Sequence, residues 1–178
     1  MQQKPKKILI STYKPSKVYG GFIYATMLKE VLSRHFQVDS LNLSFENKLP
    51  LYLKIPKILI KLWESGKRTD YDFVIKDLDS CLFLNKKPVK TIVFIHHIDY
   101  SFASSLVRLG YFFFIPLISK NLRKAKAIVV VSKYWENYFK EKGYNNVYLI
   151  YNAFNLDDFN FSEQEIAEFK KKHNLIEK

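Results

Sequence analysis

The sequence is poor in the residues that build covalent or metal-held scaffolds. Cys81 is its single cysteine, which excludes a disulfide framework and a cysteine-built metal site and fits a reducing compartment such as the cytoplasm. The basic residues after Met1 lead into only a short apolar stretch, so no secretory signal is predicted. The longest apolar run, Leu109 to Ile118, is far shorter than the ~20 residues of a membrane span. Because 48% of the 178 residues are hydrophobic, we expect one soluble domain rather than a disordered basic tail.

Acidic residues are also few. The 17 Asp and Glu stand against 29 Lys and Arg, which gives a net charge of +12. Residues 51–68 and 104–126 carry nine of these charges, beside the most apolar stretches of the chain. For any one such helix, the simpler interpretation is an apolar face on the core and a solvated lysine face. Together the two segments favour an anionic membrane surface as a partner. The basic residues expected to face it are Lys54, Lys57, Lys61, Arg123 and Lys124.

Nucleic acid would also attract this charge, but it is not expected as a partner. Zinc-finger spacing, the aromatic-rich RNA-binding signature and a basic zipper are all absent from the sequence.

Strand and helix patterns alternate along the chain. Short apolar runs predict strands, and segments of helical periodicity predict the helices between them. The strands are expected at 6–11, 36–43, 71–75, 91–95, 127–131 and 147–151, and the helices at 22–35, 51–68, 80–84, 104–124, 133–142 and 162–172. The pattern predicts an α/β fold, a Rossmann-like open parallel sheet of about six or seven strands with helices on both faces. Residues 1–160 would form this domain, and 161–178 a terminal helix that leads toward an interdomain junction.

Local signals mark three helix features. The 104–124 helix is expected to break near Gly110 or Pro116. Gly143 stands where the 133–142 helix should end. Ser162, with Glu165 three residues later, predicts a capping box for the last helix.

Polar residues and glycines gather where the predicted strands end. In an open parallel sheet, ligands bind at the carboxyl ends of the strands. The candidates there are Gly20 and Gly21 after the first strand, His96, His97 and Asp99 after the fourth, Ser132 after the fifth and Asn152 after the sixth. The glycine pair would let the backbone of a helix amino end approach a phosphate, although a tight turn explains it equally well.

His96 and His97 are the candidate catalytic residues. A histidine at a strand end can hold a phosphoryl or sugar hydroxyl, or act as an acid or base near neutral pH. Successive side chains point to opposite faces of a strand, so we expect one of the two to reach the cleft and the other to pack beneath a helix. Asp99 would orient a histidine or begin a turn. No metal site is expected, because His96, His97 and Asp99 are too close in sequence to supply tetrahedral ligands.

Several short stretches occur in an order that is typical of one enzyme family. They are K-I-L-I-S-T at 7–12, Gly20-Gly21 with L-K-E-V-L-S-R-H at 28–35, V-D-S-L at 38–41, D-F-V-I at 72–75, T-I-V-F-I-H-H-I-D at 91–99, K-A-K-A-I-V-V-V-S-K-Y at 124–134 and V-Y-L-I-Y-N-A-F-N-L-D-D-F at 147–159. This ordered set resembles the N-terminal, acceptor-side domain of the GT-B-fold retaining glycosyltransferases of family 4, over essentially the whole chain.

The resemblance implies transfer of a sugar from a nucleotide-sugar donor to a glycan or lipid-linked acceptor, with retention at the anomeric carbon and no further cofactor. It implies that Gly20 and Gly21 approach the donor diphosphate and that His96, or else His97, faces the cleft. Ser132 and Asn152 match positions of the family's motifs, and the role expected for them is a structural one. Ala153 and Asn155 depart from the glycine and aspartate that the family usually has at those positions.

The family's donor-binding domain, with its two glutamates seven residues apart, has no counterpart in this sequence. Glu165, Glu168 and Glu177 do not fit that pattern. We therefore expect a donor-binding C-terminal domain or a separate subunit as a partner. From the two basic segments, 51–68 and 104–126, we expect a peripheral position on the inner face of a membrane. The alternative is a non-catalytic membrane-docking or ligand-binding module on the same fold, because fold alone does not decide function.

Overall fold

The computed structural model describes residues 6–12, 20–43, 51–86, 89–96, 105–153 and 160–175. The first half of the chain contains β1 Lys7–Thr12, α1 Gly20–Ser33, β2 Gln37–Asn42, α2 Leu51–Lys67, β3 Phe73–Asp77 and the short 3-10 helix η1 Asp79–Leu82. The second half contains β4 Lys90–Ile95, α3 Ser105–Lys124, β5 Ala127–Val130, α4 Lys133–Glu141, β6 Val147–Leu149 and α5 Glu163–Lys172. The predicted alternation of strand and helix is confirmed.

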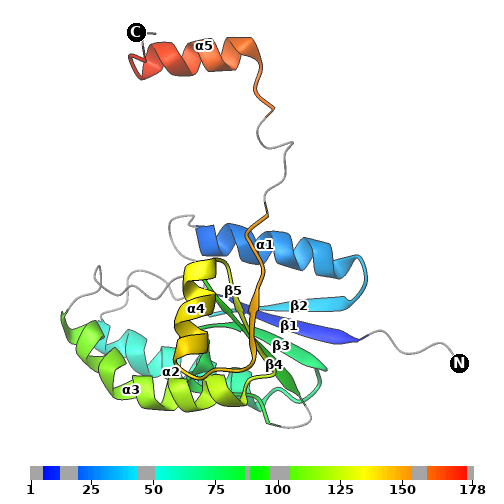
Figure 1. The fold of residues 1–178 in the computed structure, drawn as a ribbon, viewed down its shortest axis with the longest axis vertical. Helices are drawn as coiled ribbons and strands as arrows, with labels where there is room; N and C mark the ends of the chain where they lie inside the picture. The colour runs from blue at the N-terminus through cyan, green and yellow to red at the C-terminus, as the bar shows by residue number, and fades with distance from the viewer. Residues whose placement is uncertain are drawn as a thin grey trace, which may run out of the picture.

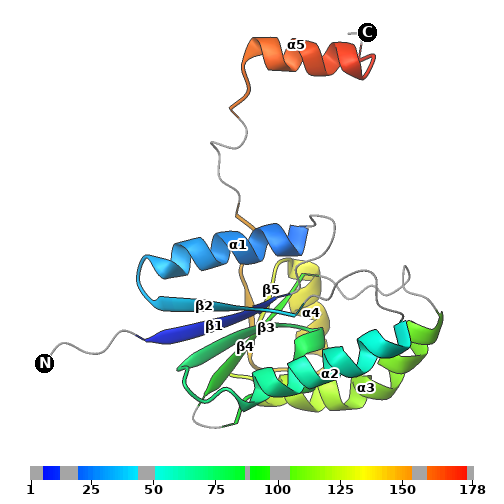
Figure 2. The same ribbon diagram turned by 180° about the vertical axis from the view of Figure 1, so that it is seen from behind.

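The six strands form one parallel sheet in the order β2-β1-β3-β4-β5-β6. The chain moves outward from β1 to β2, crosses back over β1 to β3, and then continues in the opposite direction. With right-handed crossovers, this reversal places α1 on one face of the sheet and the later helices on the other. Figures 1 and 2 show α1 alone above the sheet, with α2 and α3 side by side below it. The Rossmann-like open sheet with helices on both faces is confirmed.

Successive side chains of each strand point to opposite faces of the sheet, so the core has one part on each face. On the side of α1, Ile8, Ile10 and Ile75 pack against Leu28 and Leu32. On the other side, strand residues pack against the apolar residues of α3 and α4. That cluster includes Val93, Ile95, Ile128, Val130, Ile118, Leu122 and Phe139. Cys81 is fully buried in the same cluster, as a small hydrophobe.

The predicted break in the longest helix is wrong. Helix α3 runs without interruption from Ser105 to Lys124, through both Gly110 and Pro116. Proline removes one backbone donor, and the carbonyl left without a partner belongs to the residue four positions earlier. That residue, Phe112, is 68% exposed, so water can satisfy the carbonyl. Pro56 likewise lies inside a helix, α2.

The predicted helix ends are confirmed. Gly143 follows α4 with a φ of 77°, the left-handed conformation that glycine adopts most easily. Ser162 and Glu165 form the reciprocal capping box of α5. Helix α5 has no buried residue, and Figure 1 shows it apart from the layers of the sheet.

Candidate functional site at the carboxyl edge of the sheet

Parallel pairing brings the carboxyl ends of β1, β3, β4 and β5 to one edge of the sheet. His96 directly follows β4, whose last residue, Ile95, is paired with Val130 of β5. Helix α1 begins at Gly20, so its amino end lies at the same edge. This end carries backbone N–H groups without helical partners and a positive potential, which suits an anionic ligand. The edge therefore combines a histidine with a helix amino end.

Tyr24 connects these two elements. Its ring lies 4.9 Å from the imidazole of His96 in an edge-on arrangement, and 5.4 Å from the ring of Phe94. Phe94 and His96 are two residues apart and therefore lie on the same side of β4, the side that α1 covers. Burial raises the pKa of the Tyr24 hydroxyl, so this group stays protonated at neutral pH and can donate a hydrogen bond.

Ser132 has a structural task at this edge. It is the N-cap of α4, and its Oγ accepts a hydrogen bond from the Trp135 N–H at 3.4 Å. One turn later, Glu136 is 8% exposed and accepts hydrogen bonds from Lys133 and Lys140, both at 2.6 Å. These bonds lower the pKa of the Glu136 carboxyl, which therefore stays ionised. The first turn of α4 is thus held by its own side chains.

The other predicted site residues are distributed less closely. Asn152 is exposed on the segment that leaves β6, the edge strand two places away from β4. His97 and Asp99 lie outside the described residues. Within the described part of the chain, no three His, Cys, Asp or Glu side chains are placed to hold a metal ion.

Comparison with known proteins identifies the family. The family model described as Glycosyltransferase Family 4 matches residues 22–158, which is most of the chain. The chain belongs to Glycosyltransferase Family 4. The match begins in the first turn of α1 and includes Tyr24, His96, Ser132 and Asn152.

A solved structure shares the fold. Sucrose-phosphate synthase from Thermosynechococcus elongatus superposes with a TM-score of 0.66 at 15% sequence identity, over 96% of this chain. The chain spans about half of that protein, 53% of its length. No curated protein sequence matches significantly. The predicted fold, one half of a GT-B structure, and the predicted family are therefore both confirmed.

The family 4 chain also contains a buried cation that the sequence did not single out. Lys76 on β3 is 1% exposed, and its ammonium donates to the Phe83 carbonyl at 2.6 Å and to Ser65 Oγ at 3.2 Å. Burial lowers the pKa of Lys76 to about 8. The lysine joins β3, the end of α2 and the segment after η1. The sequence does show a lysine inside an apolar strand, which indicates a buried cation. The spacing of residues does not predict the partners of that lysine.

The predicted membrane-facing cations lie on α2 and α3, below the sheet. Lys57 is exposed and Lys61 half-buried on α2, and Lys124 is exposed on α3, whereas the side chain of Lys54 lies outside the described ones. Arg123 is committed to internal contacts, because its guanidinium donates to the carbonyls of Lys142 and Gly143 and lies over the Tyr144 ring. Among the helices of the described residues, none is long and apolar enough to cross a bilayer.

Proposed function

We propose that this chain is the acceptor-side half of a glycosyltransferase that moves a sugar from a nucleotide-sugar donor to an acceptor with retention at the anomeric carbon. The observation that carries the proposal is the family match over residues 22–158. It falls on a sheet whose carboxyl edge brings the start of α1 and His96 together through Tyr24.

The residues at this edge have distinct roles in the proposal. The backbone N–H groups at Gly20 and Gly21 hold a phosphate oxygen of the donor at the amino end of α1. The imidazole of His96 binds a hydroxyl of the transferred sugar or a phosphoryl oxygen, and Tyr24 fixes its orientation. His97 and Asp99 remain candidates for the same cleft. Ser132 keeps the first turn of α4 in place, and Asn152 supports the chain as it leaves β6.

A second half is needed for the reaction. When the glycosidic bond to the donor breaks, negative charge develops on the diphosphate and must be stabilised from the opposite wall of the cleft. We infer that a donor-binding domain supplies this wall, either on further polypeptide or on a separate subunit. The 53% coverage of sucrose-phosphate synthase supports this inference, because about half of that protein lies outside the match.

The acceptor and the location follow from the surface of α2 and α3. Lys57, Lys61 and Lys124 accompany apolar side chains that are exposed to solvent, among them Ile60 and Trp63. Such a face attracts an anionic membrane surface. We infer that the enzyme is cytoplasmic, lies peripherally on the inner face of the membrane, and glycosylates a lipid-linked acceptor.

The proposal can be tested in membranes of the source organism. Membranes from cells with and without the gene are incubated with a panel of radiolabelled nucleotide sugars, and the label is followed into lipid and glycan fractions. We expect one sugar to be incorporated only when the gene is present. Equal incorporation in both membranes for every sugar would instead support a non-catalytic module on the same fold.

A further inference from the structure

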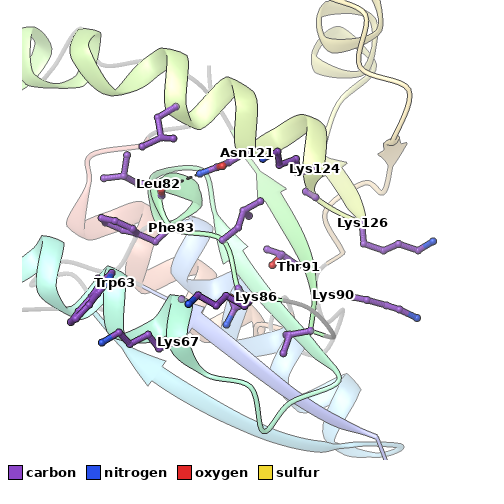
Figure 3. A pocket seen from close by; sticks show the side chains of 16 residues that line it. Trp63, Lys67, Leu82, Phe83, Lys86, Lys90, Thr91, Asn121, Lys124 and Lys126 are labelled. Atoms are coloured by element: carbon purple, nitrogen blue, oxygen red, sulfur yellow. Dashed lines mark hydrogen bonds between the residues drawn. The ribbon is translucent and has the colours of Figure 1, made fainter.

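A large cavity lies at the amino edge of the sheet, opposite the candidate site. Its volume is about 1140 Å³, and it is bounded by the last turns of α2 and α3, by the segment after η1 and by the starts of β4 and β5. Figure 3 shows Trp63 and Lys67 of α2 on one side and Asn121 and Lys124 of α3 above. The carboxyl-edge proposal makes no use of this cavity.

The cavity is positively charged. Five of the residues that line it are lysines, Lys67, Lys86, Lys90, Lys124 and Lys126, and the lining contains no acidic residue. Lys67 and Lys86 extend toward the Trp63 side, whereas Lys90 and Lys126 extend outward at the other side (Figure 3). The Lys67 ammonium lies 3.1 Å from the Trp63 ring centroid and the Lys90 ammonium 5.6 Å from that of Phe73, so these two lysines contribute mainly to the potential of the cavity. Like charges gathered without acidic partners favour an anionic ligand.

The polar groups of the wall are fixed in place. Asn121 donates to the carbonyls of Cys81 and Leu82 at 2.8 and 3.0 Å, and Asn85 donates to the carbonyls of Ser65 and Arg68 at 2.8 and 3.0 Å. The Oδ1 atom of Asn85 is buried and has no hydrogen-bond partner within the described residues. A buried acceptor without a donor is costly, but this atom has almost no accessible surface, so it belongs to the wall and is not offered to a ligand.

Apolar side chains of α2 and α3 also line the cavity. Trp63 and Leu117 line it and are 49% and 41% exposed. Further toward the start of α3, Phe112 and Phe113 are 68% and 71% exposed. Phe113 lies one turn before Leu117, about 6 Å along the helix. An anionic group in the cavity would therefore adjoin a short apolar patch that includes Trp63, Leu117 and Phe113.

We propose that this cavity binds the phosphate headgroup of an anionic membrane phospholipid, with the lipid chains lying against the exposed apolar residues of α3. Lys86 and Lys124 supply the charge for the phosphate. The exposed aromatic residues distinguish a lipid from a free phosphate, because a small anion would make no use of them. The inference rests on the membrane-facing part of the proposed function and adds a specific lipid site remote from the catalytic edge.

Binding of soluble short-chain lipids to the purified chain tests this site. Isothermal titration uses dihexanoyl phosphatidylglycerol below its micelle concentration, with dihexanoyl phosphatidylcholine, glycerol phosphate and inorganic phosphate as comparisons. We expect phosphatidylglycerol to bind at least tenfold more tightly than each of the other three. Equal binding of inorganic phosphate or glycerol phosphate would overturn the lipid assignment, and equal binding of phosphatidylcholine would overturn the role of charge.

Variants locate the site. The double substitution Lys86→Gln with Lys124→Gln should weaken phosphatidylglycerol binding at least tenfold. The matched control is Lys170→Gln with Lys171→Gln in α5, which removes the same charge elsewhere and should leave binding within about twofold. Leu117→Asp, at an exposed position, should also weaken binding, and thermal unfolding checks that each variant is folded. If both double variants lose binding equally, the cavity is not the site. Because no sugar donor is present, this result is independent of whether the chain takes part in glycosyl transfer.

Discussion

The ring of Tyr24 in α1 meets the imidazole of His96 edge-on, with 4.9 Å between their centroids. Tyr24 lies one turn after Gly20, and His96 directly follows β4, so this contact joins the amino end of α1 to the end of the fourth strand. Aromatic pairs in this geometry contribute about 0.5–1.5 kcal/mol beyond their buried area. The contact therefore orients the histidine as well as joining the two elements.

Removing the Tyr24 ring should reduce glycosyl transfer. In Tyr24→Ala the imidazole of His96 loses a packing partner, and loss of orientation alone can cost about 100-fold in rate. We expect the rate of label transfer in source membranes to fall by about 10-fold to 100-fold. Tyr24→Phe keeps the ring and should stay within about threefold of the natural protein. A Tyr24→Phe rate as low as that of Tyr24→Ala would show that the hydroxyl, rather than the ring contact, is what matters.

The buried ammonium of Lys76 predicts a specific pH dependence of stability. Its folded pKa of about 8 lies below the ordinary value of 10.5, so the unfolded chain binds this proton more tightly than the folded chain. The free energy of unfolding should therefore rise with pH between about pH 8 and pH 10.5. Relative to Lys76→Met, the natural protein should gain about 2 kcal/mol between pH 7 and pH 10.

Urea unfolding of both proteins at several pH values measures this gain, and the difference between them removes the titration of other groups. A constant difference from pH 7 to pH 10 would contradict the depressed pKa of the buried lysine.

Gly143 should resist substitution because of its backbone conformation. Its φ is 77°, and a Cβ added there would meet only Arg123 Nη1 at 3.8 Å, so space is not the limit. Gly143→Ala should lower the free energy of unfolding by about 1–2 kcal/mol. Gly143→Asn should cost less, because asparagine tolerates the left-handed region better. Chemical denaturation measures both, and equal costs for Ala and Asn would argue against a conformational origin.

The exposed phenylalanines of α3 should contribute to membrane binding. Phe112→Ser with Phe113→Ser removes two exposed rings from α3. We expect at least tenfold weaker co-sedimentation with phosphatidylglycerol vesicles, because partial burial of each ring in lipid is worth about 1 kcal/mol or more. Phe161→Ser with Phe169→Ser, two exposed rings in and near α5, is the matched control and should change little. Equal losses in the two variants would contradict docking through α3.

Much of the fold could be predicted from short-range pattern, because buried parallel strands such as Thr91–Ile95 are continuous apolar runs. The break at Pro116 was predicted wrongly, because the sequence does not reveal that Phe112 and its carbonyl lie at an exposed part of α3. The strand-end rule predicts that His96 lies at the carboxyl edge, and the structure places it directly after β4. Tyr24 was not predicted, because its contact depends on how α1 packs across β4. The partners of Lys76 and the lysine cavity likewise depend on tertiary geometry.

The most direct test of the central claim compares two histidine substitutions in source membranes supplied with the radiolabelled nucleotide sugar that the natural protein uses. His96→Ala changes the proposed cleft residue, and His35→Ala makes the same change at an exposed histidine after α1. With equal protein levels verified by immunoblotting, label incorporation should fall at least 100-fold in His96→Ala and stay within about twofold in His35→Ala. Undiminished incorporation by His96→Ala would contradict the assignment of the active site to the carboxyl edge of the sheet.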